Sequence, residues 1–347
     1  MNLLMKLGKK KTLRYLLIIL AVILAGIASA MLSRVVIPSD VDKMISLYTR
    51  NKPGAEITVA FISPDGAEIR AFGHNGKEID VPEREYEIGS VTKTFTGALV
   101  ANAVSQGRLS LDTVLGDVLP LPSGAYNPTV REIVTHTSAY SNHEPAKYGK
   151  KSNPASGITD FDVLYDMANF EPDSEPPYIY SYSDFGSAVA GIMLGDVYGK
   201  DYYTLLNDFV HLELGLKNTH VTISRPAANE QRWLPTDAYS ASSGLTSTIT
   251  DMVSYTRMVL NGGIDSLDNA IKPLKEVNAD TSVAYFWGID NATGTASHSG
   301  ETAHYASQIL LDKNNGCAVV VLSNYGNDEY GSVPQIARAV LEAHGQY

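Results

Sequence analysis

Hydrophobic positions along the chain follow a strand-like pattern near both ends and a helix-like pattern between them. A helix is predicted at 41–50, and two strands at 56–63 and 67–72 are joined by the turn residues Pro64-Asp65-Gly66. From about residue 90 to 260 the apolar residues recur mostly at helical spacing. Strand patterns then return before a closing helix, in segments at 284–289, 296–299, 305–311 and 317–323, with the helix at about 333–344.

This order of elements predicts an α+β fold with several layers. Strands from both chain ends would form one mixed, mainly antiparallel sheet flanked by helices, with the helical region of about 90–260 inserted as a subdomain. One domain is expected over 38–347, with its ligand cleft at the junction of the sheet and the helical insertion, where such clefts are common. A hydrophobic content of 44% and a charged content of 19% are typical of a globular protein.

The first 34 residues differ from the rest of the chain. A basic segment, 1–14, precedes an uncharged apolar stretch of 18 residues at 15–32, which is near the lower limit for crossing a bilayer. The positive flank predicts a cytoplasmic segment at 1–14, a transmembrane signal anchor at 15–34 and a domain outside the membrane. Ala28-Ser29-Ala30 resembles a signal-peptidase site, so a cleaved signal peptide is the alternative. We therefore expect a single-pass membrane protein with an extracellular domain, or else a secreted protein.

Charge and cysteine content narrow the function classes. The first 34 residues hold six basic and no acidic residues, so the exported part has 21 basic against 38 acidic residues, a net charge of −17. Such a balance argues against nucleic acid as a partner. The single cysteine, Cys317, lies in a strand-like apolar run, which indicates a buried structural thiol.

Ser90-Val91-Thr92-Lys93 is the first candidate for chemistry. In a helix, residues three apart lie on the same face, so the Lys93 amine can reach the Ser90 oxygen. Serine is a weak nucleophile until a neighbouring base takes its proton, and a desolvated lysine can be that base. Roughly one such S-x-x-K pattern is expected by chance in a chain of this length. By itself, Ser90 could simply be a helix N-cap.

Two further motifs follow downstream. Tyr182 and Asp184 stand two residues apart where an apolar helix begins, a rigid place from which a phenol and a carboxylate can point into a cleft. His298-Ser299-Gly300-Glu301 lies at the edge of the C-terminal strands, in a stretch rich in Gly, Ser and Thr.

Together these residues resemble the serine penicillin-recognising enzymes, a family of serine β-lactamases and penicillin-binding proteins. They are most similar to its class C β-lactamase and DD-peptidase branch, which reads S-x-x-K, Y-x-N and K-T-G or H-x-G. This chain has Ser90-x-x-Lys93, Tyr182-x-Asp184 and His298-x-Gly300 in the same order. Further family-like stretches extend the resemblance over about residues 40 to 345, including 106–112, 130–138, 214–216 and 243–248.

The resemblance implies a serine hydrolase that acts through an acyl-enzyme, without a metal or cofactor. Ser90 would attack an acyl carbon, with Lys93 and the Tyr182 phenol taking and returning its proton. The backbone N–H groups of Ser90 and Glu301 would form the oxyanion hole. Gly300 would leave room for substrate beside the strand, and His298 replaces the usual lysine of the third motif.

Asp184 departs from the family pattern. The usual asparagine offers an amide donor, whereas an ionised aspartate only accepts, and therefore favours a cationic group. Glu301 adds a second acid, and no arginine to hold a substrate carboxylate is evident from the sequence. A D-alanyl ester on teichoic acid carries an ammonium and no carboxylate, and the Y-x-D motif resembles the teichoic-acid D-alanyl esterases of this family. Asp184 as a helix cap and Glu301 as a solvated acid are the plainer alternatives.

The leading functional hypothesis is a D-alanyl esterase that removes D-alanine from (lipo)teichoic acids of the Gram-positive cell envelope. The alternative within the same mechanism is a D-alanyl-D-alanine carboxypeptidase, an endopeptidase or a β-lactamase-related peptidoglycan hydrolase. A non-catalytic wall-binding receptor is the alternative from another class. The expected partners are D-alanylated teichoic acid or a peptidoglycan stem peptide, and the cytoplasmic membrane through the N-terminal helix. The candidate substrate-binding residues are Asp184, His298, Gly300 and Glu301.

Overall fold

The computed structural model describes residues 40–140, 156–221, 233–326 and 331–344. The predicted basic segment at 1–14 and the predicted anchor at 15–34 lie outside these residues. Among the helices of the described ranges, none is both long and apolar enough to cross a membrane.

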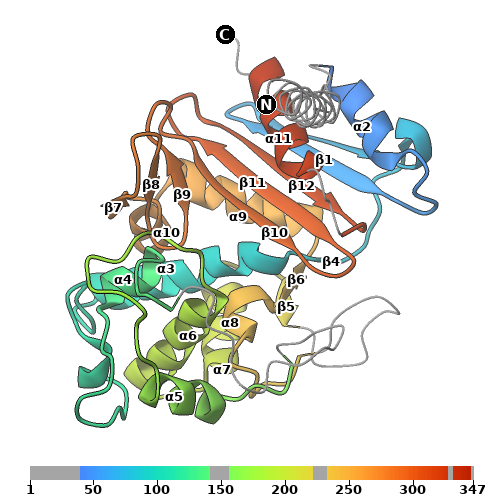
Figure 1. The fold of residues 1–347 in the computed structure, drawn as a ribbon. Coiled ribbons are helices and arrows are strands. Elements are labelled where there is room, and N and C mark those ends of the chain that lie inside the picture. Colours follow the sequence, from blue (N-terminus) through green and yellow to red (C-terminus); the bar gives the residue numbers. More distant parts are fainter. Residues whose placement is uncertain (1–39, 141–155, 222–232, 327–330, 345–347) are drawn as a thin grey trace, which may run out of the picture. The chain divides into compact units, whose positions relative to one another are not determined.

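Strands from both ends of the domain lie side by side in one antiparallel sheet (Figure 1). Its described strands are β1 (Ile57–Ser63), β2 (Gly66–Phe72), β3 (Glu78–Ile79), β7 (Lys275–Glu276), β8 (Thr281–Val283), β9 (Gly288–Asp290), β10 (Ala296–Glu301), β11 (Ala306–Asp312) and β12 (Cys317–Ser323). Their order is β3-β2-β1-β12-β11-β10-β9-β8-β7. Because β1 pairs with β12, the N-terminal and C-terminal strands form a continuous sheet. The predicted α+β fold is confirmed.

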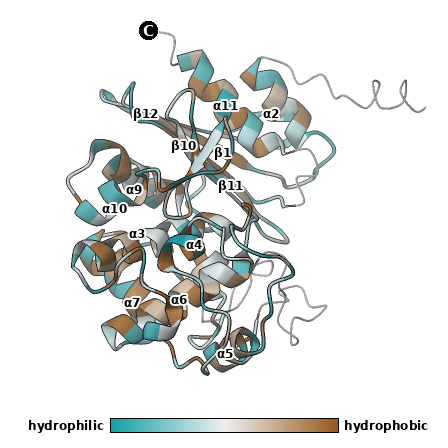
Figure 2. Ribbon diagram, turned by 60° about the vertical axis from the view of Figure 1, so that its left-hand side comes forward, coloured by the Kyte–Doolittle hydropathy of each residue, from teal (hydrophilic) through white to brown (hydrophobic). Residues whose placement is uncertain are grey.

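Helices cover both faces of this sheet (Figures 1 and 2). The helices α2 (Val41–Thr49) and α11 (Ser332–His344) pack on one face, where they cover Val319 and Val321 of β12. The opposite face, with Val320, belongs to a larger core that includes α3 (Thr92–Ser105) and α9 (Ile249–Asn261). Since successive side chains of a strand point to opposite faces, a central strand covered on both sides is apolar throughout. Cys317 is buried at the start of this strand, as predicted.

The helix α3 lies between the sheet and the remaining helices, and it brings the S-x-x-K motif into the core. It is almost entirely buried, from Thr92 to Ala101, because it has no polar face. The neighbouring elements are α4 (Val130–Val134), α5 (Asp160–Ala168), α6 (Asp184–Tyr198), α7 (Tyr202–Asp208), α8 (Ser240–Ser243), α10 (Asp265–Ala270) and the small sheet of β4 (Tyr86–Glu87), β6 (Leu245–Ser247) and β5 (His220–Val221).

The predicted strand at 284–289 is correct only at its end, because 288–289 belong to β9 whereas 284–287 form the turn between β8 and β9. Phe286 has a φ of 64°, and the Ala284 N–H donates to the Trp287 carbonyl over 2.9 Å. The Phe286 N–H donates to the Val134 carbonyl over 2.8 Å, which ties the turn to the end of α4. The run is apolar because the turn is buried against the helices, so its composition resembles that of a strand.

The contact between α3 and this turn yields a stability prediction. Gly97 of α3 is so close to the Tyr285 carbonyl that an added Cβ would collide with backbone. Gly97→Ala should therefore lower the free energy of unfolding by about 1–3 kcal/mol, although alanine is the better helix former. Urea denaturation checks this expectation. An unchanged or increased stability would show that the two segments are not packed this closely.

Candidate active site

Ser90 and Lys93 occupy the first turns of the central helix. Ser90 lies in a short 3₁₀ turn, Gly89–Val91, that leads directly into α3. This geometry places Lys93 Nζ 3.0 Å from Ser90 Oγ, to which it donates a hydrogen bond. The Lys93 side chain is completely buried, whereas Ser90 lines a cleft. A nucleophile at the surface of the cleft is thus backed by an amine in the core.

Lys93 has further partners on two other helices. Its Nζ is 2.6 Å from Asp184 Oδ1, at the start of α6. It also donates to Ser242 of α8, to the Oγ over 2.8 Å and to the backbone carbonyl over 3.1 Å. The Ser242 hydroxyl in turn donates to Asp184 Oδ1 over 2.7 Å. Sequence reasoning missed Ser242, although it directly precedes the family-like stretch at 243–248.

The Lys93–Asp184 pair is ionised. Burial opposes the charge on both groups, but the attraction between them outweighs it, so the pKa of Lys93 is raised and the pKa of Asp184 is lowered. Lys93 is therefore an ammonium at neutral pH, and Asp184 is a carboxylate. The side chain of Asp184 still has 45% of its surface exposed, so solvent reaches the pair on the side of Asp184 but not on the side of Lys93.

Asp184 is not the cap of α6. The N-cap is Ser183, whose hydroxyl accepts from the Gly186 N–H over 2.9 Å. The cap interpretation of Asp184 is thus corrected, because the side chain of Asp184 turns toward Lys93 instead.

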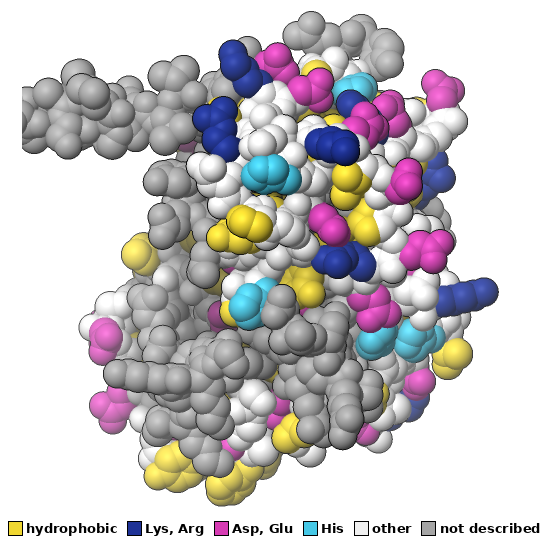
Figure 3. Space-filling view, turned by 90° about the vertical axis from the view of Figure 1, so that its right-hand side faces the viewer, with side chains coloured by type: hydrophobic (Ala, Val, Ile, Leu, Met, Phe, Trp, Pro, Cys, Tyr) yellow, Lys and Arg dark blue, Asp and Glu magenta, His cyan; other side chains and the backbone are white. Residues whose placement is uncertain are grey.

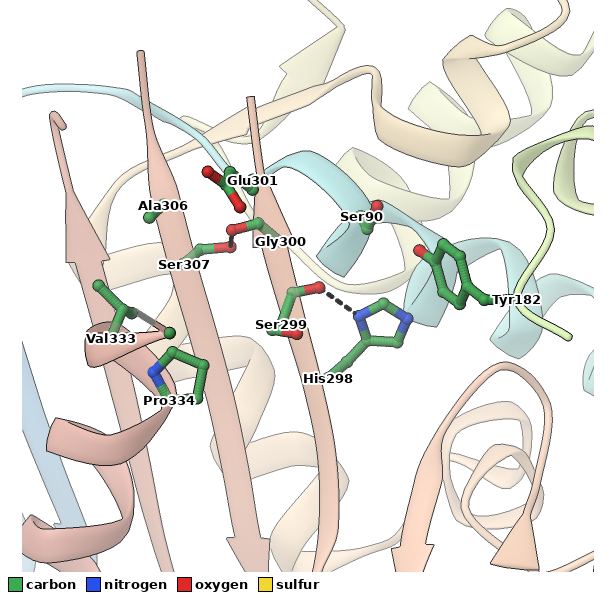
Figure 4. A pocket seen from close by; sticks show the side chains of 11 residues that line it. Ser90, Tyr182, His298, Ser299, Gly300, Glu301, Ala306, Ser307, Val333 and Pro334 are labelled. Atoms are coloured by element: carbon green, nitrogen blue, oxygen red, sulfur yellow. Dashed lines mark hydrogen bonds between the residues drawn. The ribbon is translucent and has the colours of Figure 1, made fainter. Parts of the chain in front are cut away.

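Tyr182 lies on the open side of Ser90. Its hydroxyl is directed toward Ser90 in Figure 4 and hydrogen-bonds with both Ser90 and Lys93. Burial raises its pKa, so the phenol is protonated at neutral pH. This position suits a group that passes a proton between Ser90 and a leaving group.

His136 positions the Tyr182 segment. Its Nδ1 accepts from the Ser183 N–H over 3.2 Å, and its carbonyl accepts from the Ser181 N–H over 2.9 Å. Its ring lies 4.7 Å from the Tyr182 ring between centroids. Burial, with the nearby Lys93 charge, lowers its pKa to about 3, so this imidazole is neutral at physiological pH. These contacts give His136 a structural role.

The third motif places β10 directly against the Ser90 turn. An added Cβ on Gly300 would collide with the Ile88 carbonyl and approach the Ser90 nitrogen, so only glycine fits here. An added Cβ on Gly89 would lie 2.8 Å from the Glu301 nitrogen. The backbone of the Ser90 turn is therefore in close contact with that of β10, as an oxyanion hole formed by the N–H groups of Ser90 and Glu301 would need.

His298 points toward Tyr182 from β10 (Figure 4). Its Nδ1 donates to the Ser299 carbonyl over 2.7 Å, which leaves Nε2 as the acceptor nitrogen. Its pKa is lowered to about 4, mainly by burial and to a lesser extent by repulsion from the Lys93 charge. The third motif thus contributes no positive charge at neutral pH.

The cleft has two adjoining cavities that share Tyr182, His298 and Ser299. The first, of about 430 Å³, contains Ser90, Gly300 and Glu301. The second, of about 310 Å³, extends along β10 to Ser297 and is bordered by Arg338 of α11. β9 pairs with β10 only at Ala296 and Ser297, so β9 does not cover the strand beside Ser90.

A metal site is not evident in the described ranges, where no group of three or more His, Cys, Asp or Glu side chains is arranged to hold an ion.

Comparison with known proteins identifies the family. The Beta-lactamase family profile matches residues 54–343, so the chain belongs to this family and is a serine hydrolase. A β-lactamase of Providencia stuartii is 30% identical over 195 residues, which are 54% of this chain and 47% of that protein. Protein flp of Staphylococcus aureus (strain MW2) is 25% identical over 319 residues, which are 82% of this chain and 61% of that protein.

A solved structure has the same fold. The β-lactamase/D-alanine carboxypeptidase from Pseudomonas syringae superimposes with a TM-score of 0.69 at 16% identity, covering 88% of this chain and 99% of that one. The chain spans about half to three fifths of the length of the two curated relatives. The resemblance to the serine β-lactamase and DD-peptidase family is therefore confirmed.

The contact between β10 and the Ser90 turn generates a prediction about acylation. Gly300→Ala should force the strand away from Ser90 and separate the two backbone donors. The loss of one oxyanion-hole donor typically slows the reaction by about 10²–10³-fold. The rate of Ser90 labelling by a fluorophosphonate measures this loss, with the melting temperature as a folding control. A labelling rate like that of the wild type in a folded variant would place the oxyanion hole elsewhere.

Proposed function

We propose that this serine hydrolase removes D-alanyl groups from the esters of (lipo)teichoic acid in the cell envelope. Ser90 attacks the ester carbonyl, the N–H groups of Ser90 and Glu301 hold the oxyanion, and Tyr182 returns a proton to the departing alcohol. Water then releases D-alanine from Ser90. The observation that carries this proposal is a cleft with an acid at one end and an arginine at the other.

Glu301 supplies the acid at the first end. It lines the cavity that contains Ser90, where an acyl group would sit. The D-alanyl ester has a free ammonium on its acyl part, which a carboxylate attracts. Asp184 was expected to bind this ammonium, but its Oδ1 is paired with Lys93 and Ser242. Glu301 therefore takes the larger share of this role.

Arg338 supplies the cation at the other end. It borders the second cavity, beyond Ser299, where the leaving group would extend. In teichoic acid the leaving alcohol carries a phosphodiester, and arginine binds phosphate well through its planar fork. Sequence patterns do not reveal this arginine as a site residue, because Arg338 lies on the closing helix α11, away from the three motifs.

A D-alanyl-D-alanine carboxypeptidase is the second candidate, and Arg338 also favours it. The terminal carboxylate of such a peptide would meet the same guanidinium. Its acyl D-alanine, however, has an amide nitrogen instead of an ammonium, so it offers no cationic group for Glu301 to attract. A non-catalytic receptor has no support, because the chain belongs to a family of serine hydrolases.

The net negative charge of residues 35–347 counts against binding to a polyphosphate, so the local distribution of charge matters. On the face seen in Figure 3, basic and acidic side chains are interspersed instead of forming one acidic field. Membrane attachment through the segment at 15–34 is part of the proposal, since an anchored domain would lie beside lipoteichoic acid.

The release of D-alanine tests the proposal directly. The domain, incubated with D-alanylated lipoteichoic acid, should release D-alanine, whereas the Ser90→Ala variant should release none. A D-alanyl-D-alanine peptide should be cleaved slowly or not at all. Cleavage of the peptide without release from lipoteichoic acid would overturn the esterase in favour of the carboxypeptidase.

The role of Arg338 has a separate test. Arg338→Gln should raise KM for lipoteichoic acid about tenfold or more with little change in kcat, because an ion pair to the phosphate is lost. Arg257→Gln, on the distant helix α9, is the matched control and should leave KM unchanged. Equal KM values for the wild type and Arg338→Gln would remove Arg338 from the binding site.

A further inference from the structure

Ser242 contacts both members of the ion pair between Lys93 and Asp184. Its Oγ accepts from Lys93 Nζ over 2.8 Å and donates to Asp184 Oδ1 over 2.7 Å. Because its single proton goes to Asp184, a lone pair of the oxygen must face Lys93. Ser242 as a whole residue is only 1% exposed, so water does not compete for the hydrogen bonds of its hydroxyl.

The ionised state of Lys93 limits how Ser90 can lose its proton. An ammonium has no lone pair, and it must give up a proton before it can accept one from Ser90. Five oxygens surround Nζ: Ser90 Oγ, the Tyr182 hydroxyl, Ser242 Oγ, the Ser242 carbonyl and Asp184 Oδ1. Of these, Asp184 is the anion, and its Oδ1 lies 2.6 Å from Nζ.

We propose that the proton of Ser90 passes through Lys93 to the Asp184 carboxylate, and that Ser242 is the positioning residue that holds Lys93 and Asp184 in line. In this arrangement the final acceptor of the Ser90 proton is the Asp184 carboxylate, and a neutral Lys93 is not needed as the starting base. It depends on the serine-hydrolase chemistry alone and holds for any acyl substrate.

The proton balance of the step is closed. One N–H proton of Lys93 moves to Asp184 Oδ1, and the amine then takes the Ser90 proton as the Ser90 Oγ forms its bond to the acyl carbon. The site then holds the tetrahedral adduct on Ser90, the Lys93 ammonium and a protonated Asp184. When this adduct collapses to acyl-Ser90, the bond between the acyl carbon and the leaving-group oxygen breaks. The proton held by Asp184 returns through Lys93, and Tyr182 delivers a proton to the leaving-group oxygen.

The other titratable groups around Lys93 do not supply this function near neutral pH. His136, after α4, and His298, on β10, interact electrostatically with Lys93, and both are neutral above about pH 5. Tyr182 is protonated, because burial raises its pKa. The fall of the reaction rate toward acidic pH, its acid limb, should therefore reflect protonation of Asp184, whose pKa is lowered by Lys93.

The pH dependence of Ser90 labelling by a fluorophosphonate tests this relay without knowledge of the substrate. In this reaction the Ser90 Oγ–P bond forms, the P–F bond breaks, and the Ser90 proton leaves through the relay. The wild-type rate should stay level down to mildly acidic pH. In Asp184→Asn, Lys93 must lose its proton to solvent first, so the acid limb should move upward by about two pH units or more.

Ser242→Ala should slow labelling about tenfold to a hundredfold at neutral pH, because hydrogen bonds to both charged groups are lost. Ser242→Thr keeps the hydroxyl and should restore most of the rate. Ser243→Ala, at the adjacent position, is the matched control and should label like the wild type. Melting temperatures show that each variant is folded.

Two results would overturn the inference. The first is an Asp184→Asn variant whose acid limb coincides with that of the wild type, because the acceptor would then be another group. The second is a Ser242→Ala variant with the wild-type rate and profile. If Ser242→Ala fails to fold, Ser242→Cys replaces it, because the cysteine thiol is a weak hydrogen-bond donor. A folded Ser242→Thr variant that is labelled as slowly as folded Ser242→Cys would then contradict the positioning role. Failure of D-alanine release would leave these results unaffected, since the probe carries no D-alanine.

Discussion

A buried ammonium is the constraint on which the rest of the active site depends. Lys93 is fully buried, and an unpaired charge in such a place costs several kcal/mol. The fold meets this constraint by bringing the start of α6 and the end of α8 to the same point, where Asp184 and Ser242 surround the amine. Three helices that are distant in sequence are thereby held in one relative position.

The same constraint links stability to chemistry. If Lys93 moved, Ser90 would lose its hydrogen-bond partner and Asp184 would lose its counter-ion together. On the other side of Ser90, β10 approaches so closely that Gly300 is required. The nucleophile therefore lies between two rigid surfaces, a charged cluster behind it and a strand edge beside it. Such preorganisation is what an oxyanion hole needs in order to act without rearrangement.

Much of this arrangement could be predicted from the sequence, because local patterns encode it. The spacing of Ser90 and Lys93 within one helical turn predicted their contact, and the apolar runs at both chain ends predicted the shared sheet. Arg338 and Ser242 could not be found in this way. Each reaches the cleft only through tertiary packing, and neither lies in a motif with its own chemical signature.

Asp184 shows the same limit from another direction. Its chemistry, an acceptor in place of an amide donor, was clear from the residue type. Its partner was not, since a free acid in the cleft and an acid paired with Lys93 have the same local sequence. The turn between β8 and β9 has the same limit. The apolar composition of 284–289 correctly predicted that the segment is buried, but only its hydrogen bond to Val134 shows that it bends.

The protonation state of Lys93 is the central claim, and NMR titration of its side chain tests it most directly. With lysine labelled at Cε, the Lys93 signal should keep the shift of a charged amine from mildly acidic pH to beyond the ordinary lysine range. In Asp184→Asn the same signal should titrate at a lower pH, because the counter-ion is gone while the burial persists. A Lys93 signal that titrates near neutrality in the wild-type protein would contradict this account.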